Sequence, residues 1–399
     1  MDLALAPELA ALQAKARGFV EERLLPLEER AESWGEGEHV RLELLGELRG
    51  EARRRGLWCP QMPAARGGLG LGPSGMAVLY EELGRSRFGP VACNCAAPDD
   101  GNMLVLEKVG TAAQKERWLQ PVVDGKVRSA IVMTEPPPGS GSDPGGMMLT
   151  RAERRGDRYV VSGRKWFITG AEGAAHFILL ARTSDDPRHG LTAMLFDAAQ
   201  PGWRILRRIP IMGPEEHGGH CELELDGLEV PVENVLLGEG QGMKVTQIRL
   251  GIARLTHCMR WLGMARRALE LAMPHVRERR AFGSTLADKE SVQGLLGTAA
   301  MQIDIGRLLT MRAALALERG EHARAEVSQA KIQVADALHL AVDTAIQLLG
   351  ARGYSRDTPL EWMYRYARQA RLVDGASEVH RMVVARELLK DPVGFFRWA

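Results

Sequence analysis

The segment Cys221 to Pro231, "CELELDGLEVP", decides how the middle of this chain folds. Apolar and acidic residues alternate in it, so that Leu223 and Leu225 share one face and the glutamates beside them share the other. A period of two residues is typical of a half-buried strand. Asp226-Gly227 is a dipeptide that favours a two-residue hairpin turn. We therefore expect a strand here and a hairpin at Asp226-Gly227.

The same period extends on the N-terminal side of this segment, from about residue 130. Strand patterns occur in "DRYVVSGRKWFITG" (157–170), "HFILLART" (176–183) and "LTAMLFD" (191–197), separated by Gly, Pro and Asp. Short strands with little helix between them are typical of an antiparallel barrel or sandwich.

Helical periodicity flanks this zone on both sides. Before about residue 125 the chain shows charged faces and Ala/Leu stripes, and Thr111 is a candidate N-cap. After about residue 241, two long apolar-striped segments end at Gly320 and Gly350. Long helices with short breaks are typical of a bundle. The predicted fold class is therefore α+β multidomain: an N-terminal helical domain (1–128), a middle β-barrel domain (129–238) and a C-terminal four-helix bundle (239–399).

Bulk composition narrows the class of protein. The chain has 399 residues, of which 45% are hydrophobic and 26% charged, and its net charge is +1. These values favour a globular protein of two or three domains and give no electrostatic case for nucleic acid. We expect no membrane span, because no apolar run looks long enough, and no secretory signal, because the N-terminus lacks a basic region before an apolar block. Five scattered cysteines favour a reducing compartment, which predicts a cytoplasmic protein.

Two short motifs have competing readings. "GLGPSG" (70–75) matches a dinucleotide fingerprint, but the Pro- and Gly-rich stretch before it is a poor strand, so a loop leading into a helix is favoured. "HGGHC" (217–221) offers three potential metal ligands. It lacks a fourth at finger-like spacing, so a hairpin loop is favoured over a metal site.

For three further motifs the local sequence leaves two interpretations open. "RERRAFG" (277–283) is either a solvated helix end or a pyrophosphate site, since Arg forks suit phosphate oxygens. "MTEPPPGSGSD" (133–143) is either a connector or a loop presenting N–H groups to a ligand. "RLVDGASEVHR" (371–381) breaks a helical pattern at Asp374-Gly375, either as a helix end and cap or to hold Asp374 at a pocket for proton chemistry.

In this order along the chain, "MTEPPPGSGSD", "GDRYVVSGRKWFITGA", "RRAFG", "QLLGARGY" and "DGASEVHRMVVAREL" together resemble the acyl-CoA dehydrogenase family. The resemblance covers nearly the whole chain and is strongest to the branch with Asp as catalytic base, such as the dehydrogenase domain of large kinase-fused members. It implies FAD as cofactor, an acyl-CoA substrate, an electron-transfer flavoprotein as acceptor, and a homotetramer or dimer with FAD at the subunit interface. No metal is implied.

The resemblance implies a role for each matching position. Asp374 is the base that removes the α-proton while the β-hydride passes to flavin N5, giving trans-2-enoyl-CoA. The N–H of Ala376, with a flavin ribityl hydroxyl, would hold the enolate oxygen. Implied cofactor contacts are Met133, Thr134, Ser142, Phe167, Ile168, Thr169, Arg279, Glu290, Gln347, Gly350, Ala351, Ala376 and Glu378. Implied substrate contacts are Ser142, Arg254 and Gly375.

Some positions depart from the family pattern. The 133–143 loop is two residues longer than the common form, and Glu290 stands where Gln is common. Ala376 and Glu378 replace a common Thr and Gln, and Gly251 replaces an Asp. The alternative base position of some branches is Ala253 here, which favours Asp374.

Apolar Leu372 and Val373 before Asp374 predict an apolar pocket that raises the pKa of the carboxyl. Two rival functions share the fold. One is a flavin oxidase resembling nitroalkane oxidase, which also has an Asp base. The other is a non-catalytic FAD- and DNA-binding homologue, against which the near-zero net charge argues.

Overall fold

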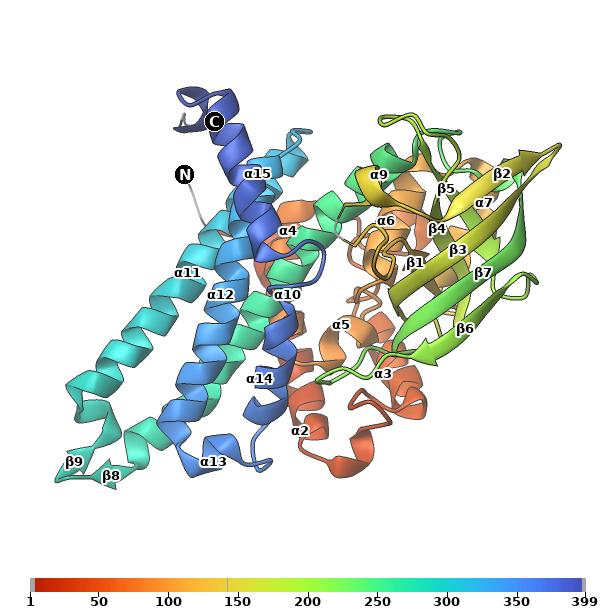
Figure 1. Cartoon of the computed structure of the whole chain (residues 1–399). Helices are drawn as coiled ribbons and strands as arrows, with labels where there is room; N and C mark the ends of the chain where they lie inside the picture. The colour runs from red at the N-terminus through yellow and green to blue at the C-terminus, as the bar shows by residue number, and fades with distance from the viewer. Residues whose placement is uncertain (1–3, 142, 397–399) are drawn as a thin grey trace.

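The computed structural model describes residues 4–141 and 143–396 and has three parts (Figure 1). The first part is helical. Its helices are α1 Pro7–Phe19, α2 Leu25–Glu28, α3 Leu42–Arg54, α4 Pro73–Gly84, α5 Phe88–Ala92, α6 Asp99–Val109, α7 Ala112–Gln114 and α8 Gln120–Val123. Thr111 caps α7 through a capping box with Gln114, as predicted. The 70–75 motif is a loop that leads into α4, and the described chain before it contains no strand, which confirms the loop interpretation.

The second part is a seven-stranded sheet. Its elements are β1 Arg128–Val132, α9 Pro144–Met147, β2 Arg151–Arg155, β3 Arg158–Thr169, β4 Ala174–Arg182, β5 Leu191–Asp197, β6 Trp203–Arg208 and β7 His220–Pro231. The strand order is β1-β4-β2-β3-β7-β6, with β5 paired to β4. The expectation of a purely antiparallel sheet is wrong, because β1 runs parallel to β4. The parallel pair is possible because α9 and two strands supply the long connection that parallel neighbours need. The sheet is a half-barrel with β1 and β6 at its ends.

The strand in 221–231 is confirmed, but the hairpin within it is wrong. Leu223 and Leu225 are buried in the core of the sheet. β7 passes through Asp226-Gly227 without a break and pairs with β3 on both sides of it. A tight hairpin of the expected type needs positive φ at both central residues, and here Gly227 has it while Asp226 does not. The dipeptide lies beside a register shift in β3, where Gly227 absorbs a β-bulge.

The third part is the helical bundle. Its main helices are α10 Gly242–Glu278, α11 Glu290–Glu318, α12 Arg324–Leu349 and α15 Ser377–Lys390, joined by β8 Arg280–Ala281, β9 Ser284–Thr285, α13 Ala351–Tyr354 and α14 Leu360–Gln369. The predicted helix ends at Gly320 and Gly350 are confirmed, and both glycines have positive φ. The expectation that no apolar run is long enough to span a bilayer is wrong. By length and composition α12 qualifies, but 56% of its apolar window is buried in the bundle.

The parts share hydrophobic cores. One cluster joins α1, α3 and α4 to α10, α11 and α12, including Phe19, Tyr80 and Trp261. A second joins α6 and α8 to β4 and β5. Because each core crosses a boundary between parts, side chains from the helical domain and the sheet are held in fixed positions beside α10.

Candidate functional site

Asp374 lies in the turn between α14 and α15, and its carboxylate is directed at α10. The side chain is 19% exposed, with Oδ1 at 3.7 Å from Arg249 Nη1 and Oδ2 at 3.5 Å from His257 Nε2. Within the described chain Oδ2 is buried and has no hydrogen-bond partner. Buried carboxylate oxygens normally accept a hydrogen bond, so one that accepts none is available to a ligand.

The electrostatics of this carboxylate differ from the sequence prediction. Burial raises the pKa of Asp374, but the cations around it outweigh burial and hold that pKa below its usual value. These cations are Arg249, Arg254 and Lys331, and the His257 ring beside the carboxylate also favours its ionised form. The predicted apolar pocket is wrong because Leu372 points out and is 56% exposed, so that the carboxylate meets α10 and α12 instead. Asp374 is therefore ionised at neutral pH.

Arg249 and His257 are site residues that the sequence reasoning missed. Arg249 is 4% exposed and donates through Nε to Asn102 Oδ1 at 3.4 Å. His257 stacks on Trp261 with ring centroids 5.0 Å apart, and burial lowers its pKa to about 4. A signal existed in the sequence, because Arg249, His257 and Arg260 recur on one face of α10 at helical spacing. Polar residues at that spacing on a buried face indicate a site.

Arg260, one turn beyond His257, forms a buried ion pair with Asp100 of α6. Its Nη1 lies 2.5 Å from Asp100 Oδ2 and also donates to Cys95 O at 2.9 Å. Thr256 donates to the same carboxylate oxygen at 2.8 Å, and the N–H of Gly101 donates to the other at 2.7 Å. This network fixes the start of α6 against the helix face that carries His257.

The other residues implied around Asp374 are also brought to it. Arg254 Nε donates to the Asp374 carbonyl at 2.7 Å, and Gly375 follows with a φ of 100°. Ala376 is the N-cap of α15, which confirms its expected place at the start of the last helix. Glu378 lies in the first turn of α15 and is exposed.

The loop carrying Met133 and Thr134 is built around a buried ion pair. Glu135 and Lys165 are both nearly inaccessible, and Lys165 Nζ donates to Glu135 Oε1 at 3.1 Å and to Met133 O at 2.9 Å. Glu135 also accepts from the N–H groups of Ser140, Leu149 and Thr150. Burial lowers the pKa of Lys165 to about 8. The pair fixes the ends of the long loop, while Ser142 lies outside the described residues.

The end of β3 presents an aromatic ring and a hydroxyl. Phe167 is 45% exposed with a φ of 50°, and Thr169 Oγ1 forms a 2.9 Å hydrogen bond with His220 Nδ1. Ile168 is buried in the core of the sheet and pairs with Cys221 of β7, so its side chain is closed to a ligand. Trp166 N–H donates to Thr134 O at 3.0 Å, so this strand end and the 133–143 loop are joined.

The histidines of the 217–221 motif make structural contacts, and the motif is the expected hairpin loop between β6 and β7. His217 Nε2 bonds to Val40 O at 2.8 Å, and its ring lies 3.7 Å from that of His39. Across the described residues no group of three His, Cys, Asp or Glu side chains is arranged to hold a metal. The motif ties the N-terminal domain to the sheet.

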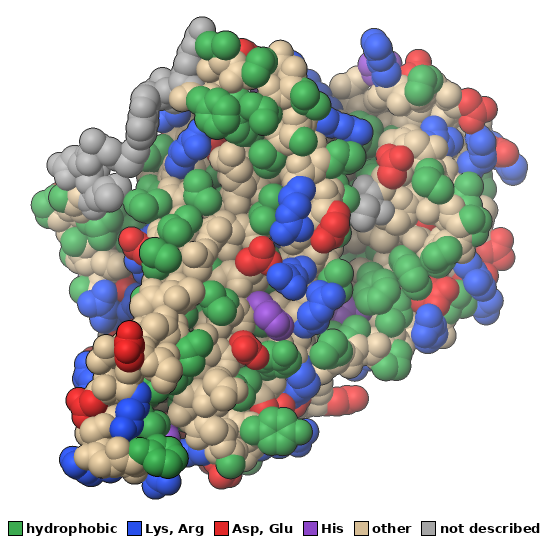
Figure 2. Space-filling model, turned by 60° about the vertical axis from the view of Figure 1, so that its left-hand side comes forward, with side chains coloured by type: hydrophobic (Ala, Val, Ile, Leu, Met, Phe, Trp, Pro, Cys, Tyr) green, Lys and Arg blue, Asp and Glu red, His purple; other side chains and the backbone are tan. Residues whose placement is uncertain are grey.

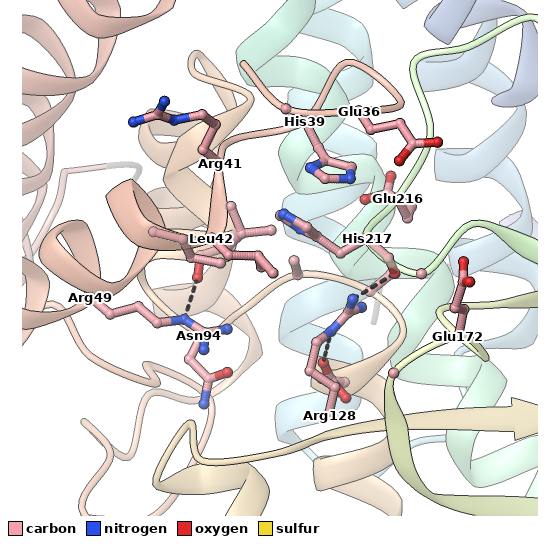
Figure 3. Close-up of a pocket in the computed structure, with 18 of the residues that line it drawn as sticks. Glu36, His39, Arg41, Leu42, Arg49, Asn94, Arg128, Glu172, Glu216 and His217 are labelled. Carbon is pink, nitrogen blue, oxygen red and sulfur yellow. Dashed lines mark hydrogen bonds and ion pairs between the residues drawn. The ribbon is translucent and has the colours of Figure 1, made fainter. Parts of the chain in front are cut away.

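A cavity of about 500 Å³ lies at this junction. Figure 3 shows His39 and His217 facing each other above Arg128, which donates to the His217 carbonyl and pairs with Asp99. A much smaller cavity, of about 40 Å³, is lined by His257, Arg260 and Glu216 and shares Glu216 with the first. The space behind His257 is therefore lined by both charged and apolar side chains.

The remaining implied cofactor residues lie apart from Asp374, at the other end of the bundle (Figure 1). We call this region, residues 279–290 with 347–354, the distal end. Arg279, Glu290, Gln347, Gly350 and Ala351 are all exposed there. Two aromatic side chains, Phe282 and Tyr354, are also 98% and 85% exposed. Within one chain, these residues do not meet the Asp374 turn.

The chain is similar to known proteins along nearly its whole length. Three family descriptions match it in succession: the N-terminal, middle and C-terminal domains of acyl-CoA dehydrogenase, over residues 6–126, 130–228 and 240–389. "Probable acyl-CoA dehydrogenase FadE2" of Mycobacterium tuberculosis is 37% identical over 397 residues, covering 97% of this chain and 96% of that protein.

Two further matches agree. Acyl-CoA dehydrogenase family member 11 of Gallus gallus is 37% identical over 359 residues, covering 87% of this chain, which spans only 45% of that longer protein. The structure of a glutaryl-coenzyme A dehydrogenase with glutaryl-CoA aligns with a TM-score of 0.86 and 27% identity, covering 98% of this chain and 97% of that one. Given these matches along its whole length, the chain belongs to the acyl-CoA dehydrogenase family.

Proposed function

We propose that the protein catalyses the FAD-dependent α,β-dehydrogenation of an acyl-CoA thioester to the trans-2-enoyl-CoA. The observation that carries the proposal is the Asp374 carboxylate, largely buried and ionised, with one oxygen that accepts no hydrogen bond in the described chain. An α-proton next to a thioester is removed when a carboxylate is held at the α-carbon and the enolate oxygen is stabilised. A low pKa keeps Asp374 ionised and able to accept the proton, but it also makes the carboxylate a weak base. Stabilisation of the enolate must therefore supply much of the lowering of the activation barrier.

The chain offers a fitting surface for FAD. Phe167 exposes an aromatic ring, and Thr169 places a hydroxyl at the end of β3. The backbone at Met133 and Thr134 is fixed by the Glu135–Lys165 pair. These residues, with Ser142, would hold the flavin, whose N5 supplies an acceptor for the β-hydride when the cofactor is bound.

Arg279, Glu290, Gln347, Gly350 and Ala351 would meet the FAD of a neighbouring copy. Their exposure at the distal end supports this, since a single chain does not bring them to the Asp374 turn. Figure 2 shows hydrophobic side chains lying among charged ones over the bundle face, as expected of a surface that packs against another copy. The assembly would be a homotetramer or dimer in the cytoplasm, with an electron-transfer flavoprotein as acceptor.

Flavin reduction tests the proposal. The purified protein should show a flavin spectrum that is bleached anaerobically by one or more straight-chain acyl-CoAs, tried from butanoyl to hexadecanoyl. Asp374→Asn should retain FAD and assembly but reduce its flavin about 10²- to 10⁴-fold more slowly, because the base is lost. Wild-type rates in this variant would contradict the assignment of Asp374. Reduction by a nitroalkane alone would favour the oxidase, and a gel shift with DNA at moderate salt would favour the non-catalytic homologue.

A further inference from the structure

The turn that carries Asp374 has a strained backbone. Asp374 has a φ of 52° and Gly375 a φ of 100°. The left-handed region is unfavourable for a residue other than glycine, at a cost of the order of 1 kcal/mol, so it persists where neighbouring groups hold it. The contacts of this turn show which groups do so.

Two successive carbonyls of the turn each accept a hydrogen bond from a cationic side chain, one partly buried and one fully buried. Arg254 Nε donates to Asp374 O at 2.7 Å, and His380 Nε2 lies 3.3 Å from the same oxygen. Lys331 Nζ donates to Gly375 O at 2.9 Å from the N-terminal part of α12. Lys331 is fully buried. The turn is thus clamped from α10, α12 and α15 at once.

The N–H groups of the same turn are free. In the part of the chain that the structure describes, the N–H groups of Asp374, Gly375 and Ala376 have no hydrogen-bond acceptor. A peptide unit is planar, and its N–H points opposite to its carbonyl. A side chain that holds Gly375 O therefore also fixes the direction of the Ala376 N–H, and Arg254 does the same for the Gly375 N–H.

We propose that Lys331 is a positioning residue for the reaction: its ammonium on the Gly375 carbonyl holds the turn so that the Asp374 carboxylate and the free N–H groups stay ready for substrate. This inference rests on the proposed function. A cation on a carbonyl also polarises that peptide unit, which makes its N–H a stronger donor to an anionic oxygen. Removal of the α-proton creates such an oxygen on the thioester.

The charge state of Lys331 supports a role beyond packing. Within the described residues its one hydrogen bond goes to Gly375 O, and no carboxylate forms an ion pair with it. Burial of such an ammonium is costly, and burial lowers the pKa of Lys331 to about 8. The ionisable groups that face it are Cys258 and Arg254 of α10, Asp374 of the turn, and Glu378 and His380 of α15. Lys331 is charged below this pKa, so the clamp weakens as pH rises through about 8.

Three variants of the FAD-loaded enzyme test the proposal, with the most reactive acyl-CoA of the butanoyl to hexadecanoyl series. Lys331→Met, similar in length but without a donor, should lower kcat about 10- to 100-fold with little change in KM, somewhat less than loss of an oxyanion donor itself. Lys331→Arg should retain most of the activity and lose the fall in kcat above pH 8, because Arg does not titrate there. Gln333→Met is the matched control, since Gln333 lies on the same helix and donates to the Gln302 carbonyl, away from the turn.

Each outcome decides the question. A kcat for Lys331→Met within threefold of wild type, or an unchanged fall near pH 8 in Lys331→Arg, would overturn the positioning role. Equal losses of kcat in Lys331→Met and Gln333→Met would indicate a general defect in the packing of the helical bundle. That result would also overturn the positioning role. If Lys331→Met does not fold, the pH profile of Lys331→Arg decides. Asp374→Asn, measured alongside, separates this inference from the proposed function, because wild-type turnover there would refute the base itself.

Discussion

The Asp374 turn and the distal end are both implied in catalysis, yet they are built in opposite ways. The turn is partly buried, its carbonyls are held by Arg254 and Lys331, and its carboxylate faces the cations Arg249 and Arg254. The distal end exposes Arg279 and two large aromatic side chains. The groups around Asp374 all come from one chain, whereas the proposed FAD contacts of the distal end would need a second copy.

The sharpest test of the buried region removes the anchor of its polar network. Asp100→Ala removes the carboxylate partner of the Arg260 guanidinium. The Asp100 side chain is fully inaccessible to solvent, so the charge of Arg260 is left buried without a counter-ion. Breaking a buried pair in this way costs about 3–5 kcal/mol of unfolding free energy. Urea denaturation should report the loss. The control is Asp304→Ala, which breaks an exposed pair with Arg307 and should cost less than about 1 kcal/mol. Equal losses in the two variants would show that the Asp100 network does not anchor the site.

The next test concerns the distal end. Arg279→Ala should weaken FAD retention about 10- to 100-fold, the usual worth of a hydrogen bond from a charged group. Flavin released on gel filtration measures this effect, and the loss should grow on dilution if the arginine comes from a neighbouring copy. Arg277→Ala is the matched control, because Arg277 is an equally exposed arginine of the same segment. Full retention of FAD in Arg279→Ala would contradict this prediction, since the distal end would then have no part in holding FAD.

A smaller effect, on pH dependence, sharpens the account of Asp374. Arg249 favours the ionised carboxylate and so lowers the pKa of Asp374. Activity that needs the carboxylate is present above this pKa and is lost as pH falls through it. Arg249→Leu removes the cation, so the pKa of Asp374 rises and the acidic fall in kcat/KM moves to higher pH. Arg249→Lys keeps the charge and should leave the profile near wild type; a shift of equal size in both variants would mean that charge is not the cause.

Local patterns predicted the fold well where periodicity is strong. The faces of Leu223 and Leu225 and the ends of α11 and α12 follow from spacing and from glycine caps. The hairpin at Asp226-Gly227 was wrong because pairing with β3 on both sides overrides a local turn preference.

The site was predictable in part. Asp374 and Arg254 came from resemblance to the family, and the structure brings them together. The apolar pocket was inferred from Leu372, a sequence neighbour, but the environment of a buried carboxylate is set by α10 and α12, which local sequence does not reveal. The helical spacing of Arg249 and His257 was a signal of a polar face, but their contact with Asp374 forms only when the bundle packs.

The smallest expected effect on the stability of the folded chain is that of a substitution at Phe282. This substitution tests whether the exposed aromatic side chains of the distal end pack against another copy. Phe282 is 98% exposed, so Phe282→Ser should change the stability of an isolated subunit by no more than about 0.5 kcal/mol. If Phe282 packs against another copy, the same change should lower the apparent mass in light scattering at micromolar concentration and weaken FAD retention together. Met212→Ser, a change at another exposed apolar residue outside the distal end, should do neither. Unchanged mass and unchanged FAD in Phe282→Ser would mean that the exposed ring faces solvent in the assembly. Support for a cofactor site shared between copies would then come from Arg279 and the other exposed polar and glycine positions of the distal end, without Phe282.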